Sequence, residues 1–312
     1  MVTEMECRRL PKILCRATNQ NAFQYDHLGC SRVFKIFPLI QSLTTSKEAV
    51  KTATVDVIRE FAEDGVVYLE LRSTPKTTSE MSKKDYVDAI IEGIKEGSKG
   101  VEMITKLILS IDRRQSVEEA EQTVEIAAAN ETGLIVGIEL SGNPAIDGRK
   151  FLPVLERARS SGLKVSIHLA EVKEQLDEVK EFLAFRPDRI GHGTFLNIQD
   201  EYVQAMVEQR IPLEICLTSN VLSMTVPTIE DSHLRFWREK SVPFCICTDD
   251  KGLMDCDLSS EYHKASNAFG FSVADLRKIS KDALEMSFLD KRSDEYRKLE
   301  VLVGQRKLLE CN

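Results

Sequence analysis

Seven short and almost continuously apolar runs constrain the fold of this chain more than any other feature of its sequence. They occupy residues 66–72, 106–112, 136–141, 164–169, 189–193, 212–218 and 243–248. Strands with one exposed face alternate apolar and polar residues, whereas nearly continuous apolar runs are typical of parallel strands that are covered on both faces. The runs therefore predict a parallel α/β fold.

Between these runs the sequence predicts α-helices. The clearest helical segments are residues 46–65, 82–100, 116–130 and 173–185. In the first of them, apolar side chains recur at three- and four-residue steps, and Asp64-Gly65 ends the pattern. Ser82 and Ser116 open the next two segments as expected N-caps. After Asp250 the chain is expected to contain helices only.

The sequence predicts one large domain preceded by an irregular segment. A chain of 312 residues with 42% hydrophobic residues can bury a substantial core, and no stretch rich in Pro, Gly or Ser divides it. Before about residue 32 the pattern fails, because the short apolar run at 10–14 is followed by a stretch with neither period. We therefore expect an irregular segment over residues 1–31 and a barrel-type domain over residues 32–312.

Charge and composition exclude several kinds of partner. A formal net charge of −8 argues against a nucleic-acid-binding surface. No apolar run approaches the roughly 20 residues of a membrane-spanning helix, and the first residues lack the apolar core of a signal peptide. The eight cysteines include no C-x-x-C pair, which suits reduced thiols rather than a disulfide framework. We expect a cytoplasmic protein that binds a small molecule, with no membrane, nucleic-acid or evident protein partner.

Residues capable of acid–base and metal chemistry follow three of the apolar runs. His168 and Glu171 end one run, His192 stands between two glycines after the next, and Asp249 and Asp250 follow the last. The carboxyl ends of parallel strands meet at one face of a barrel. These side chains can therefore converge on one site although they are far apart in the sequence.

Each of these motifs has a simpler structural explanation when it is taken alone. A buried histidine is usually a core residue, Glu171 could cap the following helix, and Asp249-Asp250 could form a solvated turn. Together they favour function, because two imidazoles and several carboxylates around one cleft can supply metal ligands, an acid and a base. Adjacent carboxylates also repel each other unless a cation compensates them. Metal-assisted hydrolysis is therefore the predicted class of reaction.

A family resemblance joins these motifs. The segments LPKI, YLELRSTPK, LSIDRR, IELSGNP, HLAE, RIGHGTF, PLEICLTSN and CTDDKG closely resemble the adenosine deaminase superfamily, and most nearly its N6-methyl-AMP deaminase (adenosine deaminase-like) branch. The match covers about residue 32 to the C-terminus. It implies a (β/α)8 barrel of the metal-dependent hydrolase kind, incomplete or irregular at the first strand. It also implies zinc-dependent hydrolytic deamination of adenine nucleotides or nucleosides, with N6-methyl-AMP, converted to IMP and methylamine, as the foremost substrate.

The resemblance assigns a role to each strand-end residue. His168 and Asp249 would ligate zinc. Glu171 would pass a proton to N1 of the purine, and His192 would help to activate the attacking water. Asp250 would orient the water or the substrate. These roles are consistent with hydrolysis at C6, which needs a nucleophilic water and an acid at N1 together.

Substrate contacts also follow from the resemblance. They are Ser73, Thr74, Pro75, Lys76, Asp112, Gly142 and Asp250. Lys76 is the candidate phosphate contact, because a lysine beside Ser and Thr at a strand end offers a charge and short donors, although most such lysines are only solvated. Arg113 and Arg114 are weaker rivals for this role.

The sequence departs from the family at its N-terminal end. The family's first strand normally follows LPKI-like residues and ends in His-x-His, which supplies half of the zinc ligands. Here LPKI is followed by LCRATNQ, and no two of the five histidines are separated by a single residue. His27 is a poor replacement, since placing it there abandons the LPKI match. Gln41 stands where the near branch has a substrate-contacting histidine. The segment 1–31 thus takes the place of the first strand and helix.

This departure leaves two functional hypotheses. His168 and Asp249 provide about two of the three protein ligands that are usual in catalytic zinc sites, so zinc binding is expected to be weakened or lost. The first hypothesis is an active zinc-dependent deaminase. The alternative is a non-catalytic or inactive shortened barrel that retains purine-nucleotide binding.

Overall fold

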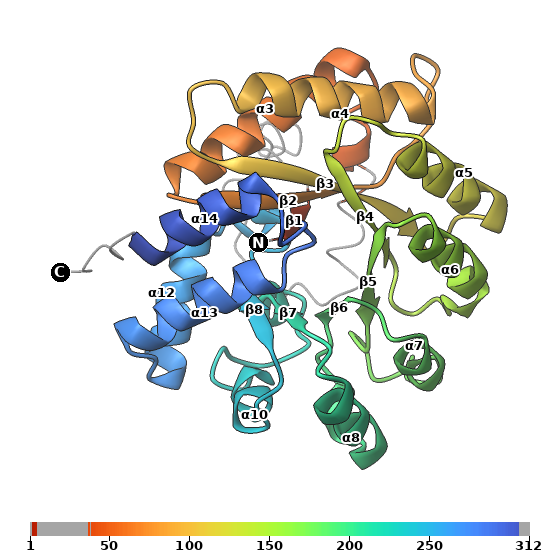
Figure 1. The fold of residues 1–312 in the computed structure, drawn as a ribbon. Helices are drawn as coiled ribbons and strands as arrows, with labels where there is room; N and C mark the ends of the chain where they lie inside the picture. The colour runs from red at the N-terminus through yellow and green to blue at the C-terminus, as the bar shows by residue number, and fades with distance from the viewer. Residues whose placement is uncertain (1, 5–36, 38, 306–312) are drawn as a thin grey trace, which may run out of the picture.

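Eight parallel strands form one curled sheet whose spatial order is the order of the chain (Figure 1). The computed structural model describes residues 2–4, 37 and 39–305. The strands are β1 (Val2–Glu4), β2 (Tyr68–Ser73), β3 (Ile104–Asp112), β4 (Ile135–Ser141), β5 (Lys164–Leu169), β6 (Arg189–His192), β7 (Leu213–Ile215) and β8 (Phe244–Ile246). All seven apolar runs therefore contain strands, and the predicted parallel α/β barrel architecture is confirmed.

The first strand, β1, was not predicted from the sequence. Its three residues pair in parallel with β2, with Val2 opposite Glu70 and Glu4 opposite Arg72. A strand of three residues is too short to show any periodicity, so the segment around it reads as irregular. The apolar run 10–14, His27 and the predicted boundary at residue 32 lie outside the described residues, and the division of domains stays a prediction.

Helices surround the sheet and connect its strands (Figure 1). They are α3 (Lys47–Glu63), α4 (Lys83–Gly97), α5 (Val117–Ala128), α6 (Leu152–Ser160), α7 (Val179–Phe185), α8 (Asp200–Gln209), α9 (Leu217–Leu222), α10 (Leu234–Glu239), α11 (Lys251–Met254), α12 (Leu258–Phe269), α13 (Val273–Glu285) and α14 (Asp294–Gln305). Ser82 and Ser116 cap α4 and α5 in reciprocal capping boxes, as predicted. No helix in the described residues is long and apolar enough to cross a membrane.

One helical prediction and one strand prediction need correction. The segment 173–185 was expected to be one helix, but α7 begins only at Val179. A buried ion pair between Glu178 and Arg113, with Nη2 and Oε1 2.7 Å apart, holds the chain just before α7, and such a tertiary contact outweighs local propensity. The run 212–218 was expected to be one strand, but β7 ends at Ile215 and α9 starts at Leu217.

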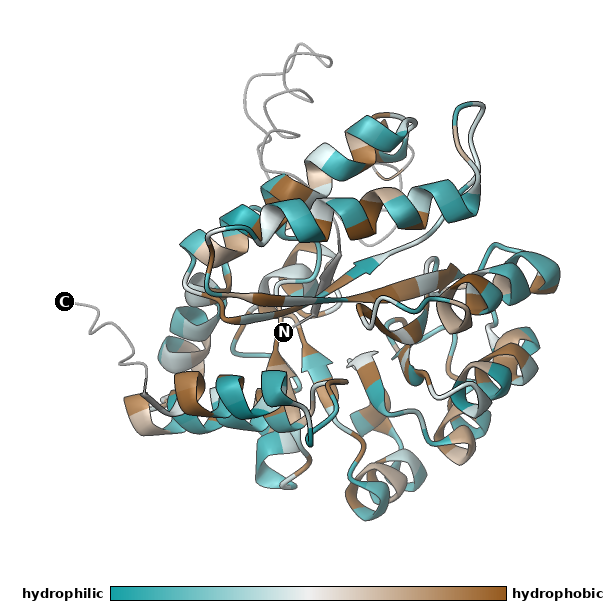
Figure 2. Ribbon diagram, turned by 45° about the horizontal axis from the view of Figure 1, so that its top comes forward, coloured by the Kyte–Doolittle hydropathy of each residue, from teal (hydrophilic) through white to brown (hydrophobic). Residues whose placement is uncertain are grey.

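The apolar core lies between the sheet and its helices. Large side chains from these outer segments, including Phe61, Phe182 and Trp237, are fully buried there. Figure 2 shows hydrophobic strands surrounded by helices that carry both hydrophilic and hydrophobic residues. This layer supports the strands whose ends carry the chemistry, because burial of apolar area is the main stabilising term in folding.

The other face of the strands is charged rather than apolar. Arg72 on β2 contacts Glu139 on β4 and Glu214 on β7, each at 2.5 Å, and Arg189 on β6 pairs with Glu214 and with Glu70 at 2.7 and 2.5 Å. All five side chains are buried. The barrel interior therefore holds an ion-pair network, which we call the Arg72 network. On β2 the network members Glu70 and Arg72 are two positions apart, so their side chains point to the same face of the strand. The apolar runs therefore contain an alternation of charged and apolar residues that their high apolar content obscures.

Four cysteines lie in the part of the chain that the structure describes. They are Cys216, Cys245, Cys247 and Cys256, and all are buried and free. Burial raises the pKa of the Cys256 thiol, so this group stays protonated and unreactive. These four residues act as small buried hydrophobic side chains, as the sequence predicted.

Candidate active site

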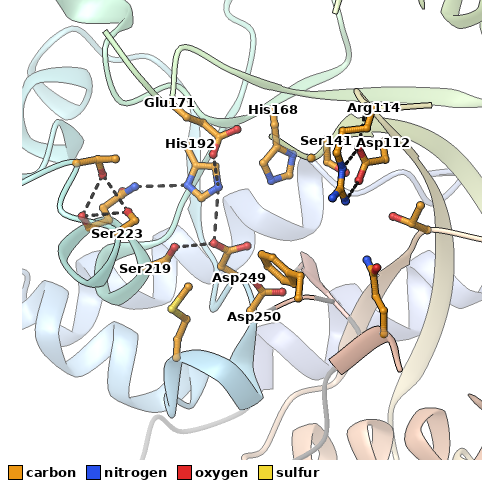
Figure 3. A pocket seen from close by; sticks show the side chains of 17 residues that line it. Asp112, Arg114, Ser141, His168, Glu171, His192, Ser219, Ser223, Asp249 and Asp250 are labelled. Carbon is orange, nitrogen blue, oxygen red and sulfur yellow. Dashed lines mark hydrogen bonds and ion pairs between the residues drawn. The ribbon is translucent and has the colours of Figure 1, made fainter. Parts of the chain in front are cut away.

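A pocket opens at the carboxyl ends of the strands (Figure 3). Eight of the residues proposed from the sequence line it: Thr74, Asp112, Gly142, His168, Glu171, His192, Asp249 and Asp250. The structure thus brings together residues from six different strand ends, as the parallel arrangement predicts.

His168, His192 and Asp249 form the candidate metal cluster. One ligand atom from each lies within 4.8 Å of the other two. The register of the sheet explains the approach of the two imidazoles, since His168 on β5 is opposite Gly191 and the rings are 4.9 Å apart. A Cβ atom at position 191 would lie 3.0 Å from Nδ1 of His168. Glycine before His192 therefore makes room for the first imidazole.

The backbone of two cluster members is strained. His192 and Asp249 adopt left-handed conformations with φ of 55° and 57°. Such conformations cost about 1–3 kcal/mol for residues other than glycine and are concentrated at functional sites. His233 supports the first of them, because its Nε2 lies 2.8 Å from the backbone oxygen of His192. The strain turns both side chains toward the pocket.

Two polar residues of α9 hold the cluster from one side. Ser219 donates a hydrogen bond of 2.6 Å to Oδ2 of Asp249, and Nδ2 of Asn220 lies 3.4 Å from Nδ1 of His192. The sequence analysis gave these residues no role. Their position directly after β7 was the available signal, since polar side chains at the carboxyl end of a barrel strand point to function.

Glu139 fixes the imidazole of His168 through its Nδ1 atom. Its Oε1 lies 2.5 Å from Nδ1 of His168, and its other contacts are Arg72 and the hydroxyl of Ser110. Burial by itself lowers the pKa of His168, but the charge of Glu139 outweighs burial and holds that pKa well above its ordinary value. With Nδ1 engaged in this way, Nε2 is the nitrogen left for a metal.

Glu171 lies beside the candidate metal cluster. Its side chain is 13% exposed and its Oε2 lies 3.7 Å from Nε2 of His192. Among the described residues, its buried Oε1 has no hydrogen-bond partner. Asp250 is buried at the start of α11 and lines the same pocket. The two carboxylates thus face the space beside the metal cluster (Figure 3).

Asp112, Gly142 and Arg114 line the pocket, and Figure 3 shows Asp112 beside Arg114 on one wall of it. Asp112 and Arg114 make an ion pair of 2.6 Å. Gly142 has a φ of 96°, and a Cβ atom there would lie 2.7 Å from Oδ1 of Asp112. Only glycine fits this position without displacing Asp112.

The four residues Ser73 to Lys76, at the end of β2 and directly after it, differ in whether they line the pocket. Thr74 lines the pocket, whereas Ser73, Pro75 and Lys76 do not. The ammonium group of Lys76 donates to the backbone oxygen of Gln41 and, at 3.0 Å, to the hydroxyl of Thr44. Partial burial lowers the pKa of Lys76. Lys76 therefore lies at the rim, where it holds the segment of Gln41, which itself lines the pocket.

The two rival arginines also differ in position. Arg113 is fully buried, forms an ion pair with Glu178 and donates a hydrogen bond of 2.8 Å to the backbone oxygen of His168. Its guanidinium is thus committed to holding the end of β5. Arg114 lines the pocket with a side chain that is 49% exposed. Of these two residues, Arg114 is the one placed to meet a ligand.

A barrel with two imidazoles and three carboxylates around one open pocket defines a class: a metal-dependent hydrolase. The adenosine deaminase family model matches residues 3–303. The chain therefore belongs to the adenosine deaminase family, whose members are metal-dependent deaminases. The resemblance inferred from the motifs is confirmed, and it extends beyond the range that the motifs covered.

Individual relatives agree with this assignment. The chain is 40% identical to the N6-methyl-AMP deaminase of Homo sapiens over 277 residues, which cover 85% of this chain and 78% of that protein. It is 41% identical to N6-methyl-AMP deaminase-L of Xenopus laevis over 263 residues, or 82% and 75% of the two chains. The solved structure of Arabidopsis N6-mAMP deaminase superposes with a TM-score of 0.89 at 31% identity, covering 98% of this chain and 97% of that one.

Proposed function

We propose that this protein is a zinc-dependent deaminase of adenine nucleotides, acting foremost on N6-methyl-AMP to give IMP and methylamine. The observation that carries the proposal is the convergence of His168, Glu171, His192 and Asp249 on one pocket. Relatives named N6-methyl-AMP deaminase support this substrate. Structures of an Arabidopsis relative complexed with IMP and with GMP support a purine nucleotide as the ligand class.

The residues of the pocket fit a divalent metal. His168 and Asp249 are the ligands that the resemblance assigns, and each is held by a polar neighbour, Glu139 or Ser219. Such outer contacts orient metal ligands and raise their basicity. When bound, zinc polarises a water molecule and makes it nucleophilic near neutral pH.

The proton transfers fall to side chains of the pocket. As the water oxygen bonds to C6, Glu171 passes its proton to N1 and His192 accepts a proton from the water. The proton on His192 then moves to the exocyclic nitrogen, the C6–N bond breaks and methylamine leaves. The second proton of the water returns to Glu171. One water proton thus leaves with methylamine, N1 of IMP keeps a proton, and the enzyme is restored.

The 5′-phosphate has two candidate partners at the mouth of the pocket. Arg114 lines the pocket, and Lys76 lies at its rim. A guanidinium that lines the pocket can bind a phosphate with two parallel hydrogen bonds. We infer that Arg114 shares the phosphate contact proposed for Lys76. Arg114→Ala should then raise KM for N6-methyl-AMP more than for N6-methyladenosine.

Turnover of N6-methyl-AMP tests the proposed function. Zinc-loaded protein should release equal amounts of IMP and methylamine, and Glu171→Gln should abolish this release while the protein still binds IMP. Binding of IMP by the unmodified protein without any release of methylamine would favour the alternative of a non-catalytic nucleotide-binding barrel. AMP and adenosine, assayed beside N6-methyl-AMP, rank the substrates.

A further inference from the structure

We infer that His192 is a metal ligand in this protein, so that His168, His192 and Asp249 together form the metal site. The inference deepens the proposed function, on which it rests for the presence of a metal. In the family's assignment His192 acts on the attacking water and does not ligate. The geometry of the pocket assigns it a different role here.

The number of ligands is the first reason. Catalytic zinc sites usually have three protein ligands and one open position. The sequence contains no His-x-His pair, so His168 and Asp249 leave such a site one ligand short. The described residues contain one cluster of three suitable ligand atoms, and its third member is His192. Two imidazoles and one carboxylate are a common donor set for catalytic zinc.

The distances are the second reason. Ligand bonds of 2.0–2.2 Å in a tetrahedral zinc site place neighbouring ligand atoms roughly 3.4 Å apart. Nε2 of His192 lies 3.7 Å from Oδ2 of Asp249, which is close to this spacing. The remaining separations are within 4.8 Å.

The environment of the other imidazole nitrogen is the third reason. Nδ1 of His192 faces the amide of Asn220 at 3.4 Å, and the Oδ1 atom of that amide is buried without a hydrogen-bond partner among the described residues. A 180° rotation of the Asn220 side-chain amide exchanges its Nδ2 and Oδ1 atoms. Oδ1 of Asn220 then faces Nδ1 of His192 and the hydroxyl of Thr194. Nδ1 then donates its proton to Asn220, and the lone pair of Nε2 is free to bind a metal.

This assignment changes the proton path. A nitrogen that binds a metal cannot also accept a proton, so the step given to His192 passes to a carboxylate that lines the pocket. Glu171 and Asp250 are the two candidates. Glu171 is the better placed of the two, because its Oε2 lies 3.7 Å from Nε2 of His192 and so faces the metal cluster. It would give its proton to N1, take one water proton and pass it to the exocyclic nitrogen as the C6–N bond breaks, and then regain the second water proton.

Zinc affinity of variants tests the assignment. We would measure zinc stoichiometry, and affinity by competition with a chromophoric chelator, for the unmodified protein, His192→Asn and Glu171→Gln. If His192 is a ligand, His192→Asn should weaken zinc binding by more than the 10–100-fold that is typical when a residue in contact with a metal ligand is changed. Glu171→Gln is the matched control, because Glu171 faces His192 from the same pocket but is outside the ligand cluster, and it should retain zinc.

Imidazole nitrogen spectra supply a readout that does not depend on the folding of a variant. In ¹⁵N-labelled unmodified protein, zinc should shift Nε2 of His192 and leave a proton on Nδ1. A His192→Asn protein that is folded and binds stoichiometric zinc with nearly unchanged affinity would overturn the inference. A Nε2 resonance that does not respond to zinc would overturn it as well.

The outcomes separate the inference from the proposed function. Zinc binding that depends on His192, without turnover of N6-methyl-AMP, would sustain the inference and refute the proposed function. Turnover of N6-methyl-AMP together with zinc binding that survives His192→Asn would sustain the function and refute the inference.

Discussion

Single side chains in this pocket depend on neighbours that have no part in the reaction. Glu139 holds Nδ1 of His168, and Asn220 faces Nδ1 of His192. Both imidazoles therefore present Nε2 to the same space. Glu139 is itself fixed by Arg72 and Ser110, so the orientation of His168 is set two contacts away from the metal cluster.

Glu139→Gln should weaken zinc binding by roughly 10–100-fold, which is the usual effect of losing a partner of a metal-ligating histidine. Glu214→Gln is the matched control, because Glu214 contacts the same guanidinium of Arg72, while its other side-chain contacts among the described residues are with Arg189 and Ser166. Its zinc affinity should stay much closer to that of the unmodified protein. Chelator competition measures both, and equal losses in the two variants would contradict a specific role for Glu139.

Gly142→Ala should impair nucleotide binding and spare the metal. A Cβ atom at this position would collide with Oδ1 of Asp112 at 2.7 Å, and the φ of 96° is itself unfavourable for alanine. The wall formed by Asp112 and Arg114 must then shift. The expected result is a higher Kd for IMP, measured by calorimetry, with unchanged zinc stoichiometry. Unchanged IMP affinity would show that this wall does not contact the nucleotide.

Among the elements, the short helix α9 links the pocket to the outer layer. Glu261 on α12 is completely buried and accepts hydrogen bonds from the backbone nitrogen, at 2.9 Å, and the hydroxyl of Thr218. The next two residues, Ser219 and Asn220, contact Asp249 and His192. The placement of two cluster members is thus anchored through α9 on α12.

Glu261→Gln should reduce the free energy of unfolding by about 1–3 kcal/mol, because a buried charged acceptor loses part of its hydrogen bonding. Glu285→Gln is the control, since its ion pair with Lys291 has both side chains 57% exposed and such pairs contribute little. Urea unfolding of the zinc-free proteins compares them. If Glu261→Gln were no more destabilised than Glu285→Gln, α9 would not depend on this anchor.

The elements also show what the sequence could and could not predict. The strands β2 to β8 were predicted because each apolar run is long enough to be recognised in the sequence. The convergence of the strand-end residues His168, His192 and Asp249 was predicted from the parallel packing of these strands. The strand β1 has three residues and carries no pattern. The start of α9 was missed because its first residue, Leu217, continues the apolar run of β7. The contacts of Ser219 and Asn220 could not be predicted, since they depend on side-chain placement across neighbouring strands.

At the scale of the whole molecule, the Arg72 network joins the two sides of the barrel. Glu70, Glu139 and Glu214 carry three negative charges and Arg72 and Arg189 carry two positive charges, all buried. This leaves one excess negative charge, which a protonated His168 balances in the metal-free protein, because the charge of Glu139 outweighs burial and holds the pKa of His168 well above its ordinary value. A cation bound at Nε2 of His168 would displace that proton and take over the compensation, so metal binding and stability of the barrel should be coupled.

Zinc should therefore raise the midpoint temperature of thermal unfolding.

The variant Arg72→Met tests the network that underlies this effect. Removing one partner of a buried ion pair usually costs about 3–5 kcal/mol, because the other charge is left uncompensated. Arg72 serves both Glu139 and Glu214, so Arg72→Met should be strongly destabilised. Adding Glu214→Gln to this variant removes one orphaned carboxylate and should recover part of the loss. Urea unfolding of the two single variants and the double variant gives their coupling energy. Strictly additive losses would mean that Arg72 and Glu214 do not act as one network, and that the barrel interior is held by its apolar layer alone.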